Sequence, residues 1–254
     1  MVHESFVFSK KIHEISTIQH GFSTRLGGHS QGAYGTLNLG LHVDDDSATV
    51  EKNTDTALGV LDLNGRTLVR LKQVHGARVV KIDETSQGVE WAADACWSET
   101  SDLVLCVLVA DCLPIVLSDQ KGSFIAAVHA GWRGTAEKIT VNMIQALKSA
   151  GKDVAEFRVA LGPAIGPCCF EVDARVAQKL KTSTRAGIGL EKSTHGDKYQ
   201  ANLWQINKQQ LLECGVPSQG IDVVRECTKC SKKYYSYRRD GGITGRQSGL
   251  IGFS

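Results

Sequence analysis

The sequence is poor in the features that mark several classes of protein. It has four prolines and 6% aromatic residues among 254 residues, and its 26 glycines follow no triplet period. Collagen-like and proline-rich architectures are therefore excluded. The longest apolar run spans only residues 103–110, which is the length of a strand, so we expect no membrane span.

A large charge of one sign is also missing. Lysine and arginine number 29 against 27 aspartates and glutamates, which leaves a formal net charge of +2. Nucleic acid is therefore not an expected partner. The N-terminus carries neither a basic region nor an apolar segment of the kind found in signal peptides, so we expect a cytoplasmic protein. In that compartment the eight cysteines would be reduced thiols, some of them potential metal ligands, rather than a disulfide framework.

Strand and helix patterns alternate along the chain without an internal repeat or a linker. We therefore expect one domain over residues 1–254, with a mixed α/β sandwich as its fold. Several apolar runs lack polar alternation, as happens when both faces of a sheet are covered. The expected strands are residues 15–24, 67–74, 78–82, 103–110, 113–117, 124–129, 157–161, 221–227, 234–237 and 250–253. The expected helices are residues 47–61, capped by Ser47, and 135–150, 173–181 and 203–214.

One candidate site lies where the buried strand 124–129 ends. His129 is followed by Gly131, Arg133 and Gly134 and then by the expected helix. Free N–H groups at a helix start favour anions, and the guanidinium of Arg133 would add a contact to phosphate or carboxylate. A core histidine that is hydrogen-bonded to a carbonyl group would give the same pattern.

Two further positions have a similar character. Cys112 lies at a break between two apolar strands, beside Asp111 and Pro114, and His75 lies at a strand end before Gly76. Together with His129 they would form a site of two imidazoles and one thiolate with an open position, which is typical of catalytic zinc. Their spacing in the sequence does not group them, and a free cysteine is commonly just a buried core residue.

Over nearly its whole length the chain resembles the YfiH family, whose members have been described as laccase-domain polyphenol oxidases, purine nucleoside phosphorylases and peptidoglycan editing factors. The matching segments are residues 23–28 (STRLGG), 37–40 (LNLG), 73–76 (QVHG), 110–114 (ADCLP), 129–134 (HAGWRG), 161–166 (LGPAIG), 237–240 (YRRD) and 244–246 (TGR). The resemblance implies a three-layer YfiH-like α/β fold. It also implies a zinc ion bound by His75, Cys112 and His129, with copper as an alternative metal.

The resemblance further implies a purine nucleoside pocket lined by Asn38, with purine nucleosides and phosphate as partners. We expect the enzyme to be a monomer. Where the family usually has an arginine that contributes to this pocket, this chain has Thr54. Arg25, Arg78 or Arg133 would then have to supply the positive charge. We include Asn38, Arg25, Arg133 and Thr54 among the predicted substrate-binding residues.

Three functions are compatible with this resemblance. The first is zinc-dependent phosphorolysis of adenosine, inosine, guanosine and methylthioadenosine, with deamination of adenosine as a second activity of the same site. The second is editing of peptidoglycan precursors by hydrolysis. The third is copper-dependent oxidation of polyphenols, although the eight histidines contain no His-X-His pair of the kind that trinuclear copper clusters use.

The chain also contains a single C-x-x-C motif, Cys227 to Cys230. A structural zinc site needs a second pair of ligands, and the adjacent Cys168 and Cys169 lack the usual spacing. We therefore expect these cysteines to be ordinary thiols at strand ends.

Overall fold

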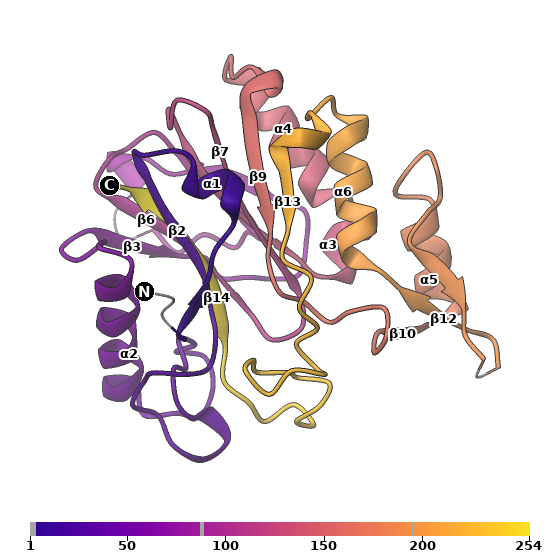
Figure 1. The fold of residues 1–254 in the computed structure, drawn as a ribbon, viewed down its shortest axis with the longest axis horizontal. Helices are drawn as coiled ribbons and strands as arrows, with labels where there is room; N and C mark the ends of the chain where they lie inside the picture. The colour runs from indigo at the N-terminus through magenta and orange to yellow at the C-terminus, as the bar shows by residue number, and fades with distance from the viewer. Residues whose placement is uncertain (1–3, 87–88, 195) are drawn as a thin grey trace.

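The computed structural model describes residues 4–86, 89–194 and 196–254. Residues 1–3, which form part of the N-terminal segment considered above, lie outside the described residues. Two large sheets pack face to face, and helices cover their outer faces (Figure 1). Among the described residues, no helix combines the length and the apolar character that crossing a bilayer requires.

The first sheet has five strands. Their order is β1 (Phe6–Val7), β2 (Ile18–Ser23), β14 (Gln247–Phe253), β6 (Leu103–Val109) and β3 (Thr67–Arg70). The β3 and β6 strands are parallel, whereas the other neighbours in this sheet are antiparallel. The C-terminal β14 strand therefore lies in the middle of the sheet, between strands from the first half of the chain.

The second sheet has six strands. Their order is β13 (Ile221–Val223), β9 (Phe157–Leu161), β7 (Leu113–Asp119), β8 (Ile125–Ala130), β5 (Ala95–Ser98) and β4 (Val79–Lys81). Both edge pairs are parallel and the inner pairs are antiparallel. A separate three-stranded sheet has the order β10 (Glu171–Asp173), β12 (Lys198–Ala201) and β11 (Leu190–Lys192).

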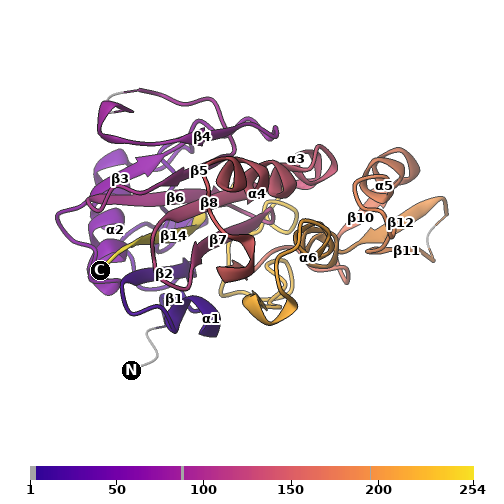
Figure 2. The ribbon, with the colours of Figure 1, turned by 90° about the horizontal axis from the view of Figure 1, so that it is seen from above.

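The described residues form six helices besides these sheets. They are α1 (Lys10–His13), α2 (Ser47–Val60), α3 (Trp132–Ala136), α4 (Ile139–Ser149), α5 (Ala174–Lys181) and α6 (Leu203–Glu213). Short 3₁₀ turns occupy Gly32–Tyr34, Glu84–Ser86, Val154–Glu156 and Ser218–Gly220. In Figure 2 the α5 helix and the small sheet lie together at one end of the molecule, away from β1 and the C-terminus.

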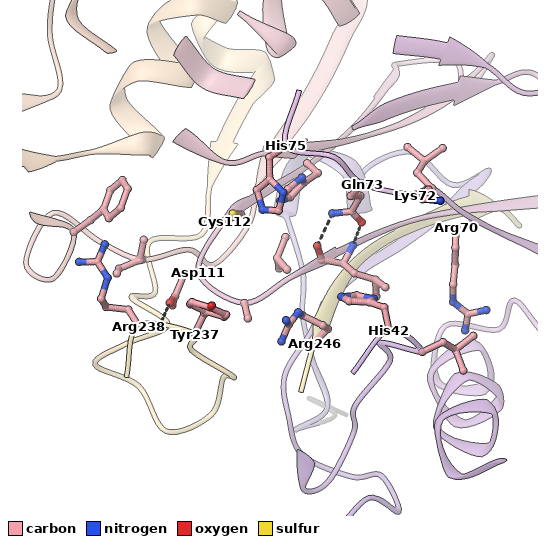
Figure 3. A pocket seen from close by; sticks show the side chains of 18 of the residues that line it. His42, Arg70, Lys72, Gln73, His75, Asp111, Cys112, Tyr237, Arg238 and Arg246 are labelled. Carbon is pink, nitrogen blue, oxygen red and sulfur yellow. Dashed lines mark hydrogen bonds between the residues drawn. The ribbon is translucent and has the colours of Figure 1, made fainter. Parts of the chain in front are cut away.

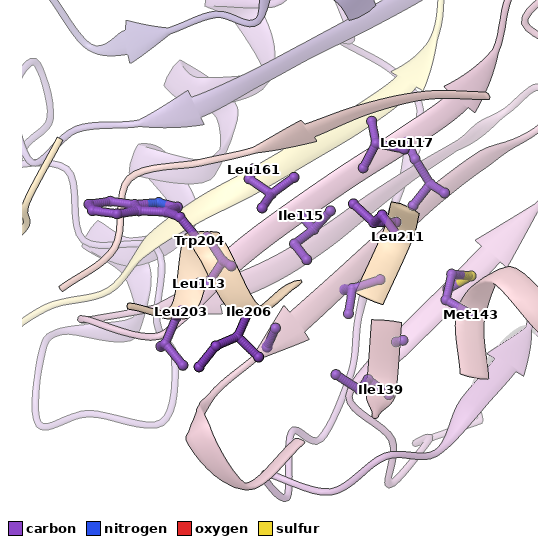
Figure 4. Packing of buried hydrophobic residues seen from close by; sticks show 14 of the residues in the cluster. Leu113, Ile115, Leu117, Ile139, Met143, Leu161, Leu203, Trp204, Ile206 and Leu211 are labelled. Carbon is purple, nitrogen blue, oxygen red and sulfur yellow. The ribbon is translucent and has the colours of Figure 1, made fainter. Parts of the chain in front are cut away.

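The apolar strands explain how the layers hold together. In β6, Leu105 and Val107 face the second sheet, while Val104, Cys106 and Leu108 pack under α2. In β7, Leu113, Ile115 and Leu117 pack instead against α4 and α6 (Figure 4). Strands that are covered on both faces need apolar residues at every position, which accounts for their lack of alternation.

The structure confirms the mixed α/β sandwich that we expected. Two sheets lie between the α2 helix on one side and α3, α4 and α6 on the other (Figure 1). The α2 helix covers the first sheet because it has its own apolar stripe, with Ala57 and Leu58 buried against that sheet.

Three local predictions were wrong. The helix expected at residues 135–150 is two helices, because Lys138 adopts a left-handed conformation (φ 64°) between α3 and α4. Asp46 rather than Ser47 caps α2, since its carboxylate accepts the amide hydrogen of Thr49. Residues 234–237 form no strand but part of a loop, in which the amide of Tyr235 donates to the side chain of Gln247.

Candidate active site

His75, Cys112 and His129 come together at one end of the second sheet. Cys112 immediately precedes β7, His129 lies in β8, and His75 lies in the loop between β3 and β4. One ligand atom from each residue lies within 4.8 Å of those of the other two. The two imidazole rings meet edge to face with a centroid separation of 4.8 Å. The pairing of β7 with β8 sets Pro114 opposite His129, which explains why a cysteine and a histidine 17 residues apart become neighbours.

A buried carboxylate, that of Asp94, holds this arrangement. Its Oδ1 atom lies 2.8 Å from His129 Nδ1 and accepts the amide hydrogen of His75 at 2.9 Å. Its Oδ2 atom accepts the amide hydrogen of Gly76 at 2.7 Å. Because Nδ1 of His129 contacts Asp94, the Nε2 atom of His129 is the nitrogen that can bind a metal ion. A carboxylate behind a histidine is the usual support of a metal-binding imidazole.

Within the cluster, the neighbouring groups favour the ionised forms of Cys112 and His129. Burial would raise the pKa of Cys112, but His129 and His75 lower it to about 6. Burial would lower the pKa of His129, but Cys112 and Asp94 raise it to about 9. For Asp94 itself, the penalty of burial is outweighed by hydrogen bonds from His129 and the loop amides, so that its pKa is lowered. Near neutral pH the thiol is therefore ready to act as a thiolate ligand.

The backbone makes room for the three side chains. His75 (φ 61°) and Asp111 (φ 88°) both adopt left-handed conformations, which are uncommon for residues other than glycine. A Cβ atom at Gly131 would lie 3.0 Å from Cys112 Sγ and 3.4 Å from His75 Cδ2. Glycine at this position thus leaves space beside the cluster, where a metal ion would have to fit.

The cluster opens into a cavity of about 820 Å³. Its charged and polar lining includes Arg70, Lys72, Asp111, Arg238 and Arg246 together with His42 and Gln73, and its apolar lining includes Leu41, Leu71, Val109, Ile165, Phe170 and Tyr237. In Figure 3, Arg70 and Lys72 lie on one side of His75 and Cys112, and Arg238 lies on the other. The cavity therefore combines soft metal ligands with positive charge and with aromatic surface.

Side-chain hydrogen bonds fix the walls of this cavity. The amide of Gln73 bonds to both the N–H and the C=O of Leu108, each at 2.8 Å, which ties the loop of His75 to β6 (Figure 3). Asp111 Oδ2 accepts the amide hydrogen of Arg238 at 2.7 Å. Burial and the neighbouring Arg246 lower the pKa of His42, so this imidazole is neutral at pH 7.

The four predicted substrate-binding residues lie outside the lining of the cavity. Asn38 is fully buried, and its Oδ1 atom accepts the amide hydrogen of Arg246 at 2.8 Å. Arg25 donates to the carbonyl of Gly35 and stacks on Tyr235, while Arg133 is exposed beside Trp132. Thr54 is buried in α2. Their contact with substrate stays a prediction, although Asn38 and Thr54 each contact a residue that lines the cavity, Arg246 and Arg70 respectively.

An arginine nevertheless lies next to Thr54. Arg70, at the end of β3, donates from Nη2 to Thr54 Oγ1 at 2.6 Å and lines the cavity. Its Nε atom is buried and has no hydrogen-bond partner among the described residues. Arg70 thus supplies positive charge to this wall of the cavity. Arg25, Arg78 and Arg133, which we considered from the sequence, do not line it.

A family model described as "Multi-copper polyphenol oxidoreductase laccase" matches residues 19–254. The chain belongs to this family. The resemblance to YfiH proteins is also confirmed, because proteins of that name are among the relatives of this laccase-like chain.

Two curated relatives and one solved structure illustrate the similarity. Purine nucleoside phosphorylase YlmD of Geobacillus stearothermophilus is 35% identical over 244 residues, covering 91% of this chain and 89% of that protein. Purine nucleoside phosphorylase YfiH of Shigella flexneri is 36% identical over 231 residues, covering 90% of this chain and 91% of that one. The crystal structure of Bacillus licheniformis hypothetical protein YfiH matches with a TM-score of 0.92 at 29% identity, covering 100% of this chain and 98% of that chain.

Sequence reasoning missed several residues of this laccase-family site. Asp94 stands alone among apolar neighbours immediately before β5, and a single polar residue in an apolar stretch was the available signal. Arg70, Arg238 and Arg246 come from three separate segments, so no local pattern links them. The structure also brings Cys168 and Cys169 to the C-x-x-C motif, so the expectation that these cysteines are unrelated thiols is wrong.

Proposed function

We propose that this protein is a zinc-dependent purine nucleoside phosphorylase, with residues 1–254 forming one catalytic domain. The observation that carries the proposal is the cavity in which the cluster of His75, Cys112 and His129 meets the basic side chains of Arg70, Arg238 and Arg246. Relatives named purine nucleoside phosphorylase, at 35% and 36% identity over most of the chain, support it.

The cavity suits a nucleoside together with phosphate. A volume of about 820 Å³ lies within the usual range for small-molecule pockets, roughly 300–1,000 Å³. The rings of Phe170 and Tyr237 offer surface for a purine, and Tyr237 is 56% exposed, so its ring is open to stacking. The substrates we propose are adenosine, inosine, guanosine and methylthioadenosine.

The donor set fits a metal ion. Two imidazoles and a thiolate with an open position are typical of catalytic zinc, and the same donors also bind copper. Zinc at this position would act as a Lewis acid toward an oxygen or nitrogen atom of the substrate or of water. Asp94 would keep His129 in the required tautomer through its contact with Nδ1.

The side chains of the cavity would then position the reactants. In phosphorolysis the bond between ribose C1′ and the purine nitrogen breaks, and its electron pair leaves with the purine. A phosphate oxygen forms the new bond to C1′, and the proton of hydrogen phosphate ends on the purine. Arg70 would hold the phosphate, because it lines the cavity and a guanidinium group pairs well with oxyanions. Fixing both reactants accounts for much of the rate that such a site provides.

We propose deamination of adenosine as a second activity of the same cavity. Water would replace the amino group at C6, and ammonia would leave. This reaction needs no phosphate, so omission of phosphate separates the two activities.

The test incubates zinc-loaded protein with inosine or adenosine, with and without phosphate, and separates the products by chromatography. We expect free base and ribose 1-phosphate only when phosphate is present, and inosine from adenosine in either condition. Absence of free base from every nucleoside would contradict the proposal. Oxidation of a diphenol by the copper-loaded protein, without nucleoside turnover, would favour the oxidase function instead.

A further inference from the structure

A second cluster of metal-binding side chains lies apart from the cavity. Cys168 and Cys169 belong to the loop between β9 and β10, and Cys227 and Cys230 belong to the long segment between β13 and β14. One sulfur atom from each cysteine lies within 4.8 Å of the other three. We propose that these four cysteines bind a structural zinc ion that joins the two segments.

The distances between the sulfur atoms fit a tetrahedral site. Zinc–thiolate bonds of about 2.3 Å in tetrahedral geometry place neighbouring sulfur atoms about 3.8 Å apart. In the structure Cys230 Sγ lies 3.6 Å from Cys168 Sγ and 3.3 Å from Cys169 Sγ. All eight cysteines of the chain are free thiols, so no disulfide uses these ligands.

The backbone around the cluster is arranged as thiolate ligands require. The amide of Gly166 donates to Cys227 Sγ at 3.2 Å, a contact that stabilises a negatively charged sulfur. A Cβ atom at Gly166 would lie 3.2 Å from Cys227 Cβ and 3.3 Å from Cys168 Sγ, so glycine allows the two segments to approach closely. Zinc with four thiolates carries a charge of −2, and the hollow beside the cysteines is lined by Lys229 and Arg238 together with the ion pair of Lys198 and Glu171.

Four soft thiolates in tetrahedral arrangement select zinc or iron. A site of four cysteines leaves no open position for a substrate, and closed sites of this type stabilise folds rather than perform chemistry. We therefore assign zinc and a structural role. The sequence concealed the site because its second pair is adjacent instead of C-x-x-C and lies about sixty residues earlier in the chain.

The cluster is connected to the cavity through short contacts. Thr228, next to Cys227, donates from Oγ1 to Asp111 Oδ1 at 2.6 Å, and Asp111 precedes Cys112. Phe170 follows Cys169 and lines the cavity, with the Arg238 guanidinium 5.5 Å from its ring centroid. A metal ion that holds these two segments together would thus keep one wall of the cavity in place.

The experiment measures zinc per chain by elemental analysis in protein purified with a thiol reductant. We expect two equivalents in the wild type, one in Cys230→Ser, one in His75→Ala, and none in the double variant. Cys214→Ser is the matched control, because Cys214 is a half-buried thiol outside both clusters, and it should keep two. Equal zinc contents in Cys230→Ser and the wild type would overturn the proposal.

X-ray absorption at the zinc edge of His75→Ala protein provides a second measurement, which does not depend on the stability of the cysteine variants. We expect four sulfur ligands at about 2.3 Å. A shell containing nitrogen or oxygen, bound iron, or a disulfide between these cysteines under reducing conditions would contradict a zinc site. A single zinc equivalent that is lost in Cys230→Ser but kept in His75→Ala would uphold this site while refuting the metal of the proposed catalytic centre.

Discussion

Asp94 shows how much a single side chain determines in this molecule. The carboxylate is fully buried, and it receives the amides of His75 and Gly76 as well as the imidazole of His129. One residue therefore sets both the conformation of a loop and the orientation of a candidate ligand. Removing its charge should weaken metal binding more than it weakens the fold.

We predict that Asp94→Asn lowers zinc affinity about 10- to 100-fold, as is usual when the partner of a ligating histidine is changed. The measurement is competition with a chromophoric chelator in the Cys230→Ser background, where only one zinc site is expected. Asp102→Asn, an exposed aspartate just before β6, is the control and should bind as the parent does. An unchanged affinity in Asp94→Asn would show that Asp94 does not support a metal ligand.

Arg70 is the residue that we expect to contact phosphate. A charge-assisted hydrogen bond contributes about 1.5–3 kcal/mol, so Arg70→Met should raise the KM for phosphate roughly 10- to 150-fold. The KM for the nucleoside should change little. Arg66→Met serves as control, because Arg66 lies just before β3 and donates to the carbonyl of Ser101 instead of lining the cavity. Steady-state kinetics at varied phosphate concentration tests this. An unaltered KM for phosphate would show that phosphate does not bind to Arg70.

At the scale of elements, the apolar pattern of the sequence predicts which face of a helix is buried better than it predicts where helices and strands begin and end. The stripe of Ile139, Met143, Ile144 and Leu147 is buried as one face of α4, because the 3.6-residue period follows directly from burial against the sheet. The break at Lys138 was not visible, since lysine has no strong preference for the left-handed conformation that separates α3 from α4. Residues 234–237 form a loop instead of the expected strand, and in this loop Tyr234 and Tyr235 are buried.

The junction of α1, β2 and β13 depends on a neutral histidine. His20 Nε2 in β2 accepts the amide hydrogen of Ser9, and the Ser9 hydroxyl donates to Asp222 in β13. Burial, followed by the charge of His13, lowers the pKa of His20 from 6.5 to about 4. Between these pH values the unfolded chain binds more protons than the folded one. The stability that depends on neutral His20 is therefore fully present above pH 6.5 and is lost as the pH falls toward 4.

We predict that His20→Gln removes this component of the pH dependence, roughly 3 kcal/mol between pH 7 and pH 4. Urea unfolding at a series of pH values measures it as the difference between the variant and the wild type. His29→Gln, at an exposed position, should retain the wild-type dependence. Parallel stability curves for His20→Gln and the wild type would refute the role of His20.

At the scale of the whole molecule, the fold class followed from covered strands and interleaved helices, but the site did not follow from any pattern. His75, Cys112 and His129 were grouped through family resemblance, and only the pairing of distant strands brings them together. The positive wall of the cavity likewise requires tertiary structure. The burial of a residue can be predicted from its sequence neighbours, whereas a site assembled from distant segments cannot.

The core, rather than the metal, should hold the fold. Leu113 is fully buried between the second sheet and its helices, so Leu113→Ala should lower the free energy of unfolding by about 2–5 kcal/mol. The neighbouring Cys112→Ala should change the stability of the chelator-treated protein by less than about 1 kcal/mol. Urea unfolding of both variants in the presence of chelator tests the contrast. Global unfolding of Cys112→Ala would show that the metal site is required for the fold.

The central claim is that the cluster of His75, Cys112 and His129 binds a metal ion needed for phosphorolysis. The most direct test measures zinc content and phosphate-dependent release of hypoxanthine from inosine on the same preparations of wild type, Cys112→Ala and Cys214→Ala. We predict that Cys112→Ala loses one zinc equivalent and its hypoxanthine release together, while Cys214→Ala matches the wild type. Full zinc content or an undiminished rate in Cys112→Ala would contradict the account.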